Sequence, residues 1–371
     1  MAQEPDPYGG RTSGATGILT SNLLNGRPPG ATLDASPWAA FAQTRSLNAA
    51  VAGRKDQFRD DLEATQHTPV AVLLSTYNGS RHIQPQLESI AAQTYRNWTL
   101  FWRDDGSTDR TASIVDAFIR SAGQRRGGAV AEPMGHLGIT GSFMALLRQV
   151  PEGTVAAFAD QDDVWLPDKV ARGVTALEAV PAGLPALYCA RQCLVDESLS
   201  PLGLSPHPRQ STGFPAALTQ NVATGCTVML NPAAVALIAA SDPPDGTLHD
   251  WWSYLLVSAA GGRLIADPVP VVLYRQHAGN AVGAPHSPLR RGIMALRRGP
   301  DTFMQLFRRH VAALVACSPV LSPEVEGDLR LLEHALGGNL LTRLRALRRV
   351  RGLIRQTRSE TLLFRLWFLI G

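Results

Sequence analysis

Short apolar segments alternate with amphipathic helical segments in the middle of this chain, and this alternation constrains the fold more than any other feature. Val70–Leu74 and Val155–Ala159 are continuous apolar runs of the kind that fill the centre of a parallel sheet. Thr99–Trp102 is a further candidate strand, and residues at helical spacing follow each strand, near 83–92, near 108–119 and from Pro167 onward. Strand, loop and helix in repetition predict an α/β fold with a doubly wound, mostly parallel sheet and helices on both faces.

Three loops of this predicted sheet carry polar or acidic side chains. They follow Leu74, Trp102 and Ala159, the last residues of the three candidate strands. The carboxyl ends of parallel strands meet at one edge of the sheet, where ligands of such folds bind, so we expect the functional site there. Less regular segments complete the pattern, with strands expected near 187–193, 224–230 and 270–273 and helices near 142–150 and 250–260.

Composition divides the chain into three parts. Residues 1–66 begin with a stretch rich in Gly, Pro, Ser and Thr, which predicts a flexible N-terminal arm, and a loosely amphipathic helix is expected at 38–64. Residues 67–285 contain the α/β pattern and form the predicted catalytic domain. Residues 286–371 hold 15 Arg, no Lys and 6 acids, a net charge of +9, which leaves −5 for the rest of the chain. We expect this last part to be a basic helical extension.

The cysteines and the apolar runs indicate in which cellular compartment the protein is expected. Cys189, Cys193, Cys226 and Cys317 form neither a Cys-x-x-Cys pair nor a regular framework, which argues against disulfides and a zinc site. The N-terminus opens with acids and Pro instead of a basic and then apolar signal, and no apolar run approaches the roughly 20 residues that span a bilayer. These features predict a cytoplasmic protein that is neither secreted nor integral to a membrane.

Acidic residues cluster in three places, at Asp104-Asp105, at Asp160–Asp163 and at Asp250. Clustered carboxylates repel one another unless a cation, a bound sugar or a proton resolves the conflict. The triplet Asp160-Gln161-Asp162 is an Asp-x-Asp (DXD) motif directly after a buried strand, where oxygen ligands can hold Mg²⁺ or Mn²⁺ against a diphosphate. The alternative is that the triplet only caps a helix or faces solvent.

The order of the motifs resembles the family 2 glycosyltransferases of the GT-A fold, particularly the rhamnosyltransferase-like members. The matching segments are Ser75–Gly79, Asp104–Asp109, Asp160–Lys169, Asn221–Thr227, His249–Trp252 and Tyr274–His277. Together they cover roughly residues 69–283, with both flanks outside the match. The resemblance implies a GT-A type nucleotide-binding sheet, plus the helical C-terminal extension expected from composition.

The implied activity is that of an inverting, metal-dependent hexosyltransferase in cell-surface polysaccharide biosynthesis. The enzyme would move a sugar from a nucleotide-sugar donor to a glycan or lipid-linked acceptor. Rhamnosyltransferase-like members imply L-rhamnose from dTDP-L-rhamnose, and a UDP-hexose is the alternative donor. A rival of another class is a non-catalytic glycan- or nucleotide-binding module that keeps the fold without turnover, although the retention of Asp162 and Asp250 argues against it.

The resemblance also implies which residues hold the nucleotide. The loop residues Thr76, Tyr77 and Asn78 would cradle the pyrimidine and ribose together with Asp104. Asp105 would accept hydrogen bonds from the base or hold the loop.

A second set of residues would lie at the ribose, the metal and the diphosphate. Asp160 would lie near the ribose, and Asp162 would be the direct protein ligand of the Mg²⁺ or Mn²⁺ ion, with Asp163 in support. Arg275 and His277 would lie at the diphosphate or the metal. Their ordinary alternative is that an Arg and a His in a loop are solvated.

Asp250 is the candidate general base, which would deprotonate the acceptor hydroxyl as it attacks from the face opposite the leaving group. An acid at the start of an apolar helix is also commonly a helix cap, and that alternative stays open. A tryptophan beside it can stack on a sugar and shield the site from water, while one of the two is expected to be core. The expected acceptor side consists of Thr224, Gly225, Cys226, His249, Trp251 and Trp252.

The basic tail contains an amphipathic pattern from Leu341 to Ile354, with arginines interleaved, and a second apolar stretch at 362–370. Such helices can lie on an anionic membrane, which would give the protein a peripheral position on the inner face of the cell membrane, near a lipid-linked acceptor. The alternative is that they pack on the catalytic domain with the arginines in water. Nucleic-acid binding is not expected because no recognition motif accompanies the arginines.

Overall fold

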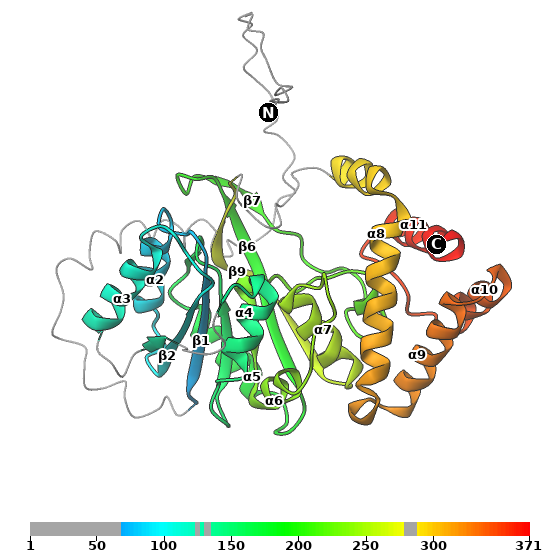
Figure 1. The fold of residues 1–371 in the computed structure, drawn as a ribbon, viewed down its shortest axis with the longest axis horizontal. Helices are drawn as coiled ribbons and strands as arrows, with labels where there is room; N and C mark the ends of the chain where they lie inside the picture. Colours follow the sequence, from blue (N-terminus) through cyan, green and yellow to red (C-terminus); the bar gives the residue numbers. More distant parts are fainter. Residues whose placement is uncertain (1–67, 123–126, 130–134, 278–287) are drawn as a thin grey trace, which may run out of the picture. The chain divides into compact units, whose positions relative to one another are not determined.

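The computed structural model describes residues 68–122, 127–129, 135–277 and 288–371 (Figure 1). The N-terminal arm and the helix expected at 38–64 lie outside these residues. The strands are β1 (Val70–Thr76), β2 (Trp98–Asp104), β3 (Gly127–Ala129), β4 (Val155–Ala159), β5 (Val164–Trp165), β6 (Ala186–Val195), β7 (Pro201–Leu204), β8 (Met229–Leu230) and β9 (Arg263–Arg275). The α-helices are α2 (Ile83–Ala91), α3 (Thr111–Ala122), α4 (Gly138–Leu147), α5 (Lys169–Glu178), α6 (Pro232–Ala239), α7 (His249–Ala259), α8 (Pro288–Ala316), α9 (Pro323–Leu336), α10 (Leu340–Arg349) and α11 (Arg358–Ile370).

Within the described residues the strands form one nine-stranded sheet in the order β3-β2-β1-β4-β8-β6-β9-β5, with β7 paired to β6. The first part is parallel, since β1 pairs with both β2 and β4, and β2 pairs with β3. β6 and β9 form a further long parallel pair. The antiparallel pairings involve β5, β7 and β8 and are short. The expected α/β class is confirmed, with the antiparallel pairs confined to the second part of the sheet.

Helices cover both faces of the sheet, as the alternation of residues in β1 requires. Ala71 and Leu73 belong to a core shared with buried residues of α4, α6 and α7. Val70, Val72 and Leu74 belong to a second core shared with α2, α3 and α5. The parallel strands are therefore buried on both sides, which is why they read as unbroken apolar runs in the sequence.

Two expected elements differ from the structure. The helix expected at 142–150 begins earlier, at Gly138. The strand expected at 224–230 is replaced by a 3₁₀ turn at Gly225–Thr227 followed by the two residues of β8. The turn closes because the Thr227 and Val228 N–H groups donate to the carbonyls of Thr224 and Gly225, both at 2.9 Å. An apolar run alone does not distinguish such a buried turn from a strand.

Residues 288–371 form a helical part that lies on the opposite side of the α/β part from β1 and β2 (Figure 1). Side chains cap three of its helices: Ser322 caps α9, Asn339 caps α10 and Thr357 caps α11. An aromatic cluster joins α8 to α11, with the ring of Phe307 5.6 Å from that of Phe364 and 5.9 Å from that of Phe368. Among the described residues, no helix is both long enough and apolar enough to cross a membrane.

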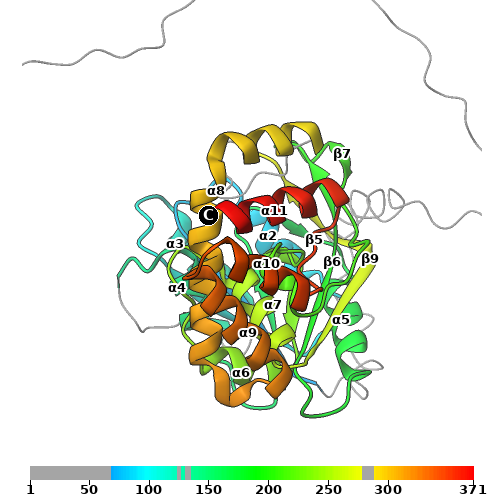
Figure 2. The same cartoon turned by 90° about the vertical axis from the view of Figure 1, so that its right-hand side faces the viewer.

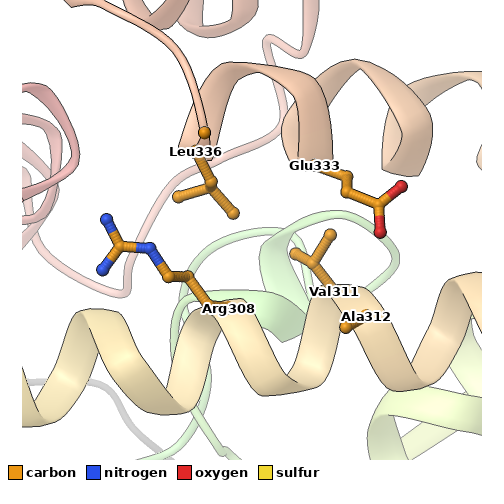
Figure 3. A pocket seen from close by; sticks show the side chains of 6 residues that line it. Arg308, Val311, Ala312, Glu333 and Leu336 are labelled. Carbon is orange, nitrogen blue, oxygen red and sulfur yellow. The ribbon is translucent and has the colours of Figure 1, made fainter.

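A hollow of about 260 Å³ lies between α8 and α9. Arg308, Val311 and Ala312 of α8 face Glu333 and Leu336 of α9 across it (Figure 3). The hollow contains none of the residues that the sequence analysis selected. Its walls are helix side chains of the C-terminal part and not loops at the edge of the sheet, so it carries no role in the site described next.

Candidate functional site

The exits of β1, β2 and β4 meet at one edge of the sheet. Thr76, the last residue of β1, lies opposite Asp104, the last residue of β2, in parallel register. On the other side of β1, Leu74 lies opposite Ala159, and Asp160 follows directly. The loop after β1 is therefore flanked by the two acidic motifs, as the order of the parallel strands led us to expect.

Asp104 is held in place by the loops around it. Its Oδ1 accepts hydrogen bonds from Thr76 Oγ1 at 2.8 Å and from Ser107 Oγ at 2.6 Å, and its Oδ2 accepts from the Ser107 N–H at 2.8 Å. Trp102 Nε1 donates to Thr76 Oγ1 at 3.0 Å and fixes that hydroxyl in turn. The carboxylate remains partly exposed at the sheet edge. It is a fixed acceptor, which is what a sugar hydroxyl would need.

Asn78 links the β1 loop to the β2 loop. It has a positive φ of 48°, a conformation that Asn tolerates better than most residues. Its N–H donates to Ser107 Oγ at 2.8 Å, and its Oδ1 accepts from the Thr108 N–H at 2.8 Å. Asn78 thereby holds two loops at a fixed separation, so its side chain is already engaged within the protein.

Tyr77 links the β1 loop to the DXD loop. Its N–H donates to Gln161 Oε1 at 2.9 Å, and Gln161 Nε2 donates back to the Tyr77 carbonyl at 3.0 Å. The Tyr77 ring is exposed, and its centroid lies 5.2 Å from that of His136. Sequence reasoning missed His136 entirely and treated Gln161 only as a spacer. The one sequence feature that could have indicated a role for Gln161 is its position between Asp160 and Asp162.

Asp105 is buried and serves the loop. Arg103 Nη1 lies 2.5 Å from its carboxylate, and the N–H groups of Leu137 and Gly138, at the start of α4, donate to it at 2.7 and 2.9 Å. Burial acts to raise the pKa of Asp105, but these donors outweigh it and the pKa lies below its usual value. Of the two roles expected for Asp105, the contacts favour holding the loop over reading the base.

Asp162 and His277 lie in contact, although 115 positions separate them. Asp162 Oδ2 is 2.8 Å from His277 Nε2, and both side chains are largely buried. Arg275 lies beneath them: its Nε donates to the Asp162 carbonyl at 2.9 Å, and its Nη1 donates to the Glu197 carbonyl. The guanidinium group therefore supports the DXD loop, and it is only 4% exposed.

The contact between Asp162 and His277 fits a divalent cation. A carboxylate oxygen and an imidazole nitrogen on separate loops converge at hydrogen-bonding distance, and both atom types bind Mn²⁺. A second group of candidate ligand atoms, from Asp160, Asp163 and Cys226, lies within 4.8 Å of one another. The buried amine of Lys169 already lies close to these three residues. The pair of Asp162 and His277 is therefore the better fit.

Lys169 is fully buried beneath the acidic motif. Its Nζ lies 3.1 Å from the centroid of the Trp165 ring and 3.5 Å from the Phe158 carbonyl oxygen. Burial lowers the pKa of Lys169 to about 7, although Cys226, Asp163 and Asp160 act to raise it. Burial and the neighbouring acids Asp162 and Asp250 raise the pKa of Asp160 to about 7. An amine and a carboxyl group are thus held close together under the loop, and burial disfavours the charged form of each.

Asp250 is buried in the first turn of α7 and receives several hydrogen bonds. Its Oδ2 accepts from the Gly225 N–H at 2.9 Å and its Oδ1 from the Trp251 N–H at 2.6 Å, and the Asn221 side chain also hydrogen-bonds it. Burial raises the pKa of Asp250 to about 6, against the lowering effect of these donors. An acid with this pKa is ionised at neutral pH and more basic than a solvated one.

The turn at Gly225 connects the candidate base to the acidic motif. Gly225 donates to Asp250, and the thiol of the next residue, Cys226, hydrogen-bonds Asp163. Asp163 is fully buried, and its Oδ1 accepts from the Arg275 N–H at 3.2 Å. A side chain at position 225 would meet His249 Nε2 at 3.0 Å and Asp250 Oδ2 at 3.5 Å. Glycine at this position permits the close approach.

Three of the expected acceptor-side residues, Trp252, His249 and Cys226, lie inside the protein, and Trp252 is thus the tryptophan that belongs to the core. Trp252 is fully buried, and its Nε1 donates to Ser241 Oγ at 2.8 Å. His249 stacks on Phe143, with 3.8 Å between ring centroids, and burial lowers its pKa to about 3. Cys226 is fully buried. Successive residues of a helix point to different sides, so neighbours of a site residue need not share its environment.

Trp251 and Thr224 are the expected acceptor-side residues with partly exposed side chains. Trp251 Nε1 donates to the Ala217 carbonyl at 2.9 Å, and its ring meets that of His310 of α8 edge to face, with centroids 4.8 Å apart. Trp251 thus lies between the α/β part and α8. Asn221, the first residue of the matching segment Asn221–Thr227, was not among the expected site residues, yet it contacts Asp250 directly.

Comparison with protein families gives a match to one of them. Residues 71–200 match the model of the family described as Glycosyl transferase family 2. The chain is 28% identical over 226 residues to the dTDP-rhamnosyl transferase RfbG of Shigella flexneri, covering 57% of this chain and 74% of that protein. It is 31% identical over 101 residues to the UDP-Glc:alpha-D-GlcNAc-diphosphoundecaprenol beta-1,3-glucosyltransferase WfgD of Escherichia coli, covering 27% of this chain and 38% of that protein.

The chain spans 59% of the length of an uncharacterized glycosyltransferase of Rickettsia typhi, to which it is 24% identical. Among solved structures, TarS 1-349 of S. aureus in complex with UDP-GlcNAc is 14% identical, with a TM-score of 0.49 and 72% coverage of each chain. The mannosyltransferase PcManGT of Pyrobaculum calidifontis, in complex with GDP-Man and Mn2+, is 18% identical, with a TM-score of 0.46 and coverage of 90% and 94%.

Proposed function

Residues 71–200 of this chain match the family 2 glycosyltransferases, and from that premise we propose that it has the GT-A fold and is an inverting, metal-dependent hexosyltransferase. It moves a sugar from a nucleotide-sugar donor to a glycan or lipid-linked acceptor in cell-surface polysaccharide biosynthesis. One observation carries this proposal. The turn Gly225-Cys226 joins the buried carboxylate of Asp250 to Asp163 of the DXD loop, so one short turn links a candidate base to the loop that carries the candidate cation site.

The donor side consists of fixed acceptors around the β1 loop. Asp104, held by Thr76 and Ser107, accepts from the ribose hydroxyls, and Asp160 lies on the other side of the same loop. The exposed Tyr77 ring, beside His136, offers an apolar face to the pyrimidine. Asn78 and Asp105 act through the loops they hold, since their side chains are engaged within the protein.

Asp162 and His277 would hold the divalent cation, Mg²⁺ or Mn²⁺, and Arg275 keeps the DXD loop in place. When bound, the ion neutralises negative charge that grows on the departing nucleoside diphosphate. The choice between the two ions follows from the ligands. His277 nitrogen favours Mn²⁺, because Mg²⁺ prefers oxygen ligands alone.

Asp250 takes the proton from the attacking acceptor hydroxyl. Its raised pKa of about 6 leaves it ionised at neutral pH, and the Gly225 and Trp251 N–H groups orient it. Attack opposite the leaving group inverts the anomeric centre in one step, and no protein nucleophile is needed. Cys226, fully buried and bonded to Asp163, is not placed to act as one.

We propose dTDP-L-rhamnose as the donor because RfbG, named a dTDP-rhamnosyl transferase, matches the largest share of this chain among the relatives reported above. The alternative is a UDP-hexose, since WfgD is named a UDP-Glc-dependent glucosyltransferase and matches a shorter segment at 31% identity. The same site accommodates either donor class. A non-catalytic binding module remains the rival, and it would not require a buried, raised-pKa carboxylate at position 250.

Calorimetric titration of dTDP, UDP and GDP, with and without Mn²⁺, tests the proposal. We expect one pyrimidine diphosphate to bind tightly with Mn²⁺, and Asp162→Ala to lose this metal dependence. Asp116→Ala, which removes an exposed acid of α3, is the matched control and should bind as the wild type does. Binding without any metal dependence, or no binding, would remove Asp162 from the site and favour the rival module.

A further inference from the structure

Helix α11 has two apolar faces, and only one of them is covered. Phe364, Trp367 and Phe368 are buried against α8 in the aromatic cluster. Leu362, Leu366 and Ile370 recur every fourth residue on another face and are 72%, 51% and 64% exposed. A surface helix ordinarily turns a polar face outward. A repeated stripe of large exposed apolar residues instead marks a face that binds something.

Helix α10 adds a second exposed row beside it, since α10 and α11 are in contact (Figure 2). Leu340 and Leu341 at its start are 55% and 63% exposed. Arg345, Arg348 and Arg349 follow with exposed side chains, and no ion pair forms at any of the three within the described part of the chain. The six side chains Leu341, Arg345, Arg348, Leu362, Leu366 and Ile370 define what we call the α10–α11 surface.

Charge separates sharply between neighbouring helices. Residues 340–371 contain eight Arg and one acid, Glu360, a net charge of +7. Helix α9, next to α10, contains four acids and one Arg. An anionic surface would therefore attract α10 and α11 and repel α9, which fixes the side of the helical part that can approach it. Charge and exposed leucines select the same two helices.

The loop between α10 and α11 packs directly on the acceptor side of the site. Gln356 Oε1 accepts from the Arg209 N–H at 2.7 Å, and the Gln356 N–H donates to Gln220 Oε1 at 3.1 Å. Thr219 Oγ1 donates to the Ile354 carbonyl at 2.6 Å. The segment contacted in this way runs straight into Asn221–Gly225, which holds Asp250. The α10–α11 surface is thus fixed rigidly to the segment beside the candidate base.

We propose that the α10–α11 surface docks on an anionic lipid bilayer, with Leu362, Leu366 and Ile370 entering the acyl boundary and the arginines contacting lipid phosphates. Amphipathic helices with apolar and basic side chains bind the membrane interface in this way. The docking itself is independent of catalysis. Its consequence, delivery of a lipid-linked acceptor to the Asn221–Gly225 side of the site, rests on the proposed function.

Sedimentation of the full chain with vesicles tests the docking. We expect binding to vesicles of phosphatidylglycerol mixed equally with phosphatidylcholine, no binding to phosphatidylcholine alone, and weaker binding as salt rises. The triple variant Leu362→Ser, Leu366→Ser, Ile370→Ser should bind at least about tenfold more weakly, as should Arg345→Gln, Arg348→Gln, Arg349→Gln. The arginine variant changes only charged, exposed side chains, so it still tests vesicle binding if the serine variant folds poorly.

Matched controls lie elsewhere on the molecule. Leu202→Ser removes an exposed leucine of β7, and Arg120→Gln with Arg263→Gln removes two exposed arginines of α3 and β9. These variants should bind vesicles as the wild type does. The proposal would be overturned if the controls lost vesicle binding equally or if the wild type bound neutral vesicles. It would also be overturned if the wild type were a dimer that the triple serine variant dissociates, because a second copy of the chain would then cover the α10–α11 surface.

Donor binding separates this proposal from the transferase proposal. The vesicle variants should retain metal-dependent nucleotide binding, because none of the changed residues lies at the sheet edge. Vesicle binding without nucleotide binding would refute the transferase proposal and support the docking proposal. Nucleotide binding without vesicle binding would support the transferase proposal and refute the docking proposal.

Discussion

The backbone N–H of Gly225 donates to Oδ2 of Asp250 at 2.9 Å, and no side chain larger than hydrogen fits between them without moving His249. His249 cannot withdraw easily, because Phe143 stacks on its ring and Phe158 meets it edge to face. The position of the candidate base therefore depends on a missing side chain at residue 225. The geometry of the turn at Gly225 thereby sets the position of the Asp250 carboxylate.

Gly225→Ala should lower kcat by about 100-fold while leaving donor affinity unchanged, because a displaced base is poorly aligned with the acceptor hydroxyl. Steady-state kinetics and nucleotide titration measure the two effects separately. Gly327→Ala in α9 is the matched control, since nothing lies within 4 Å of its added methyl group. That control should keep full activity and gain slight stability from higher helix propensity. Equal kcat in both variants would refute the positioning role of Gly225.

The acid limb of the kcat profile should lie near pH 6, because Asp250 must be ionised to accept a proton and its pKa is about 6. Activity falls as pH drops through this value.

Asn221→Ala removes a hydrogen-bond donor that favours the ionised carboxylate of Asp250, so the acid limb of the kcat profile should move to higher pH by about one unit. Asp250→Asn should remove turnover by at least about 100-fold with donor affinity retained. A merely structural role for Asn221 would leave the limb where it is.

Asp104 and Asp105 are adjacent in sequence but should respond differently to substitution. Asp105→Ala removes the carboxylate that contacts the buried Arg103 and frees the start of α4, so the free energy of unfolding should fall by about 3–5 kcal/mol. Asp104→Ala should cost less stability, since its carboxylate is partly exposed, yet it should abolish nucleotide binding. Chemical denaturation and nucleotide titration of both variants check this contrast. Equal stability losses would show that exposure does not separate the two roles.

The parallel half of the sheet and the strand exits could be predicted because β1 and β4 are buried on both faces and read as plain apolar runs. The roles of Asp105 and Trp252 could not be read in the same way. Asp105 meets the start of α4, more than 30 positions away, and Trp252 meets Ser241 across the α6–α7 loop. Asn221 reaches Asp250 only because a turn, and not the expected strand, forms at Gly225. Motif spacing carries no information on such tertiary contacts.

His310 should make the protein less stable in mild acid. It is fully buried, its Nε2 lies 2.7 Å from Thr247 Oγ1, and burial lowers its pKa to about 4 from an ordinary value of 6.5. Between these values the unfolded chain binds the proton and the folded chain does not. The contribution of His310 to stability therefore falls as pH drops below about 6.5, by up to about 3 kcal/mol at pH 4.

A comparison of wild type with His310→Phe isolates this contribution, because Phe keeps the ring packing on Trp251 but cannot titrate. Other buried groups titrate in both proteins alike, and Asp250, with its raised pKa, acts with the opposite sign. The variant loses the bond to Thr247 at every pH, so it should be the less stable protein at pH 7.5. The gap in unfolding free energy should narrow steadily towards pH 5, since only the wild type is destabilised by protonation of the unfolded chain at this position. Urea unfolding at several pH values measures the gap, and a constant gap would mean that His310 is not buried in its neutral form.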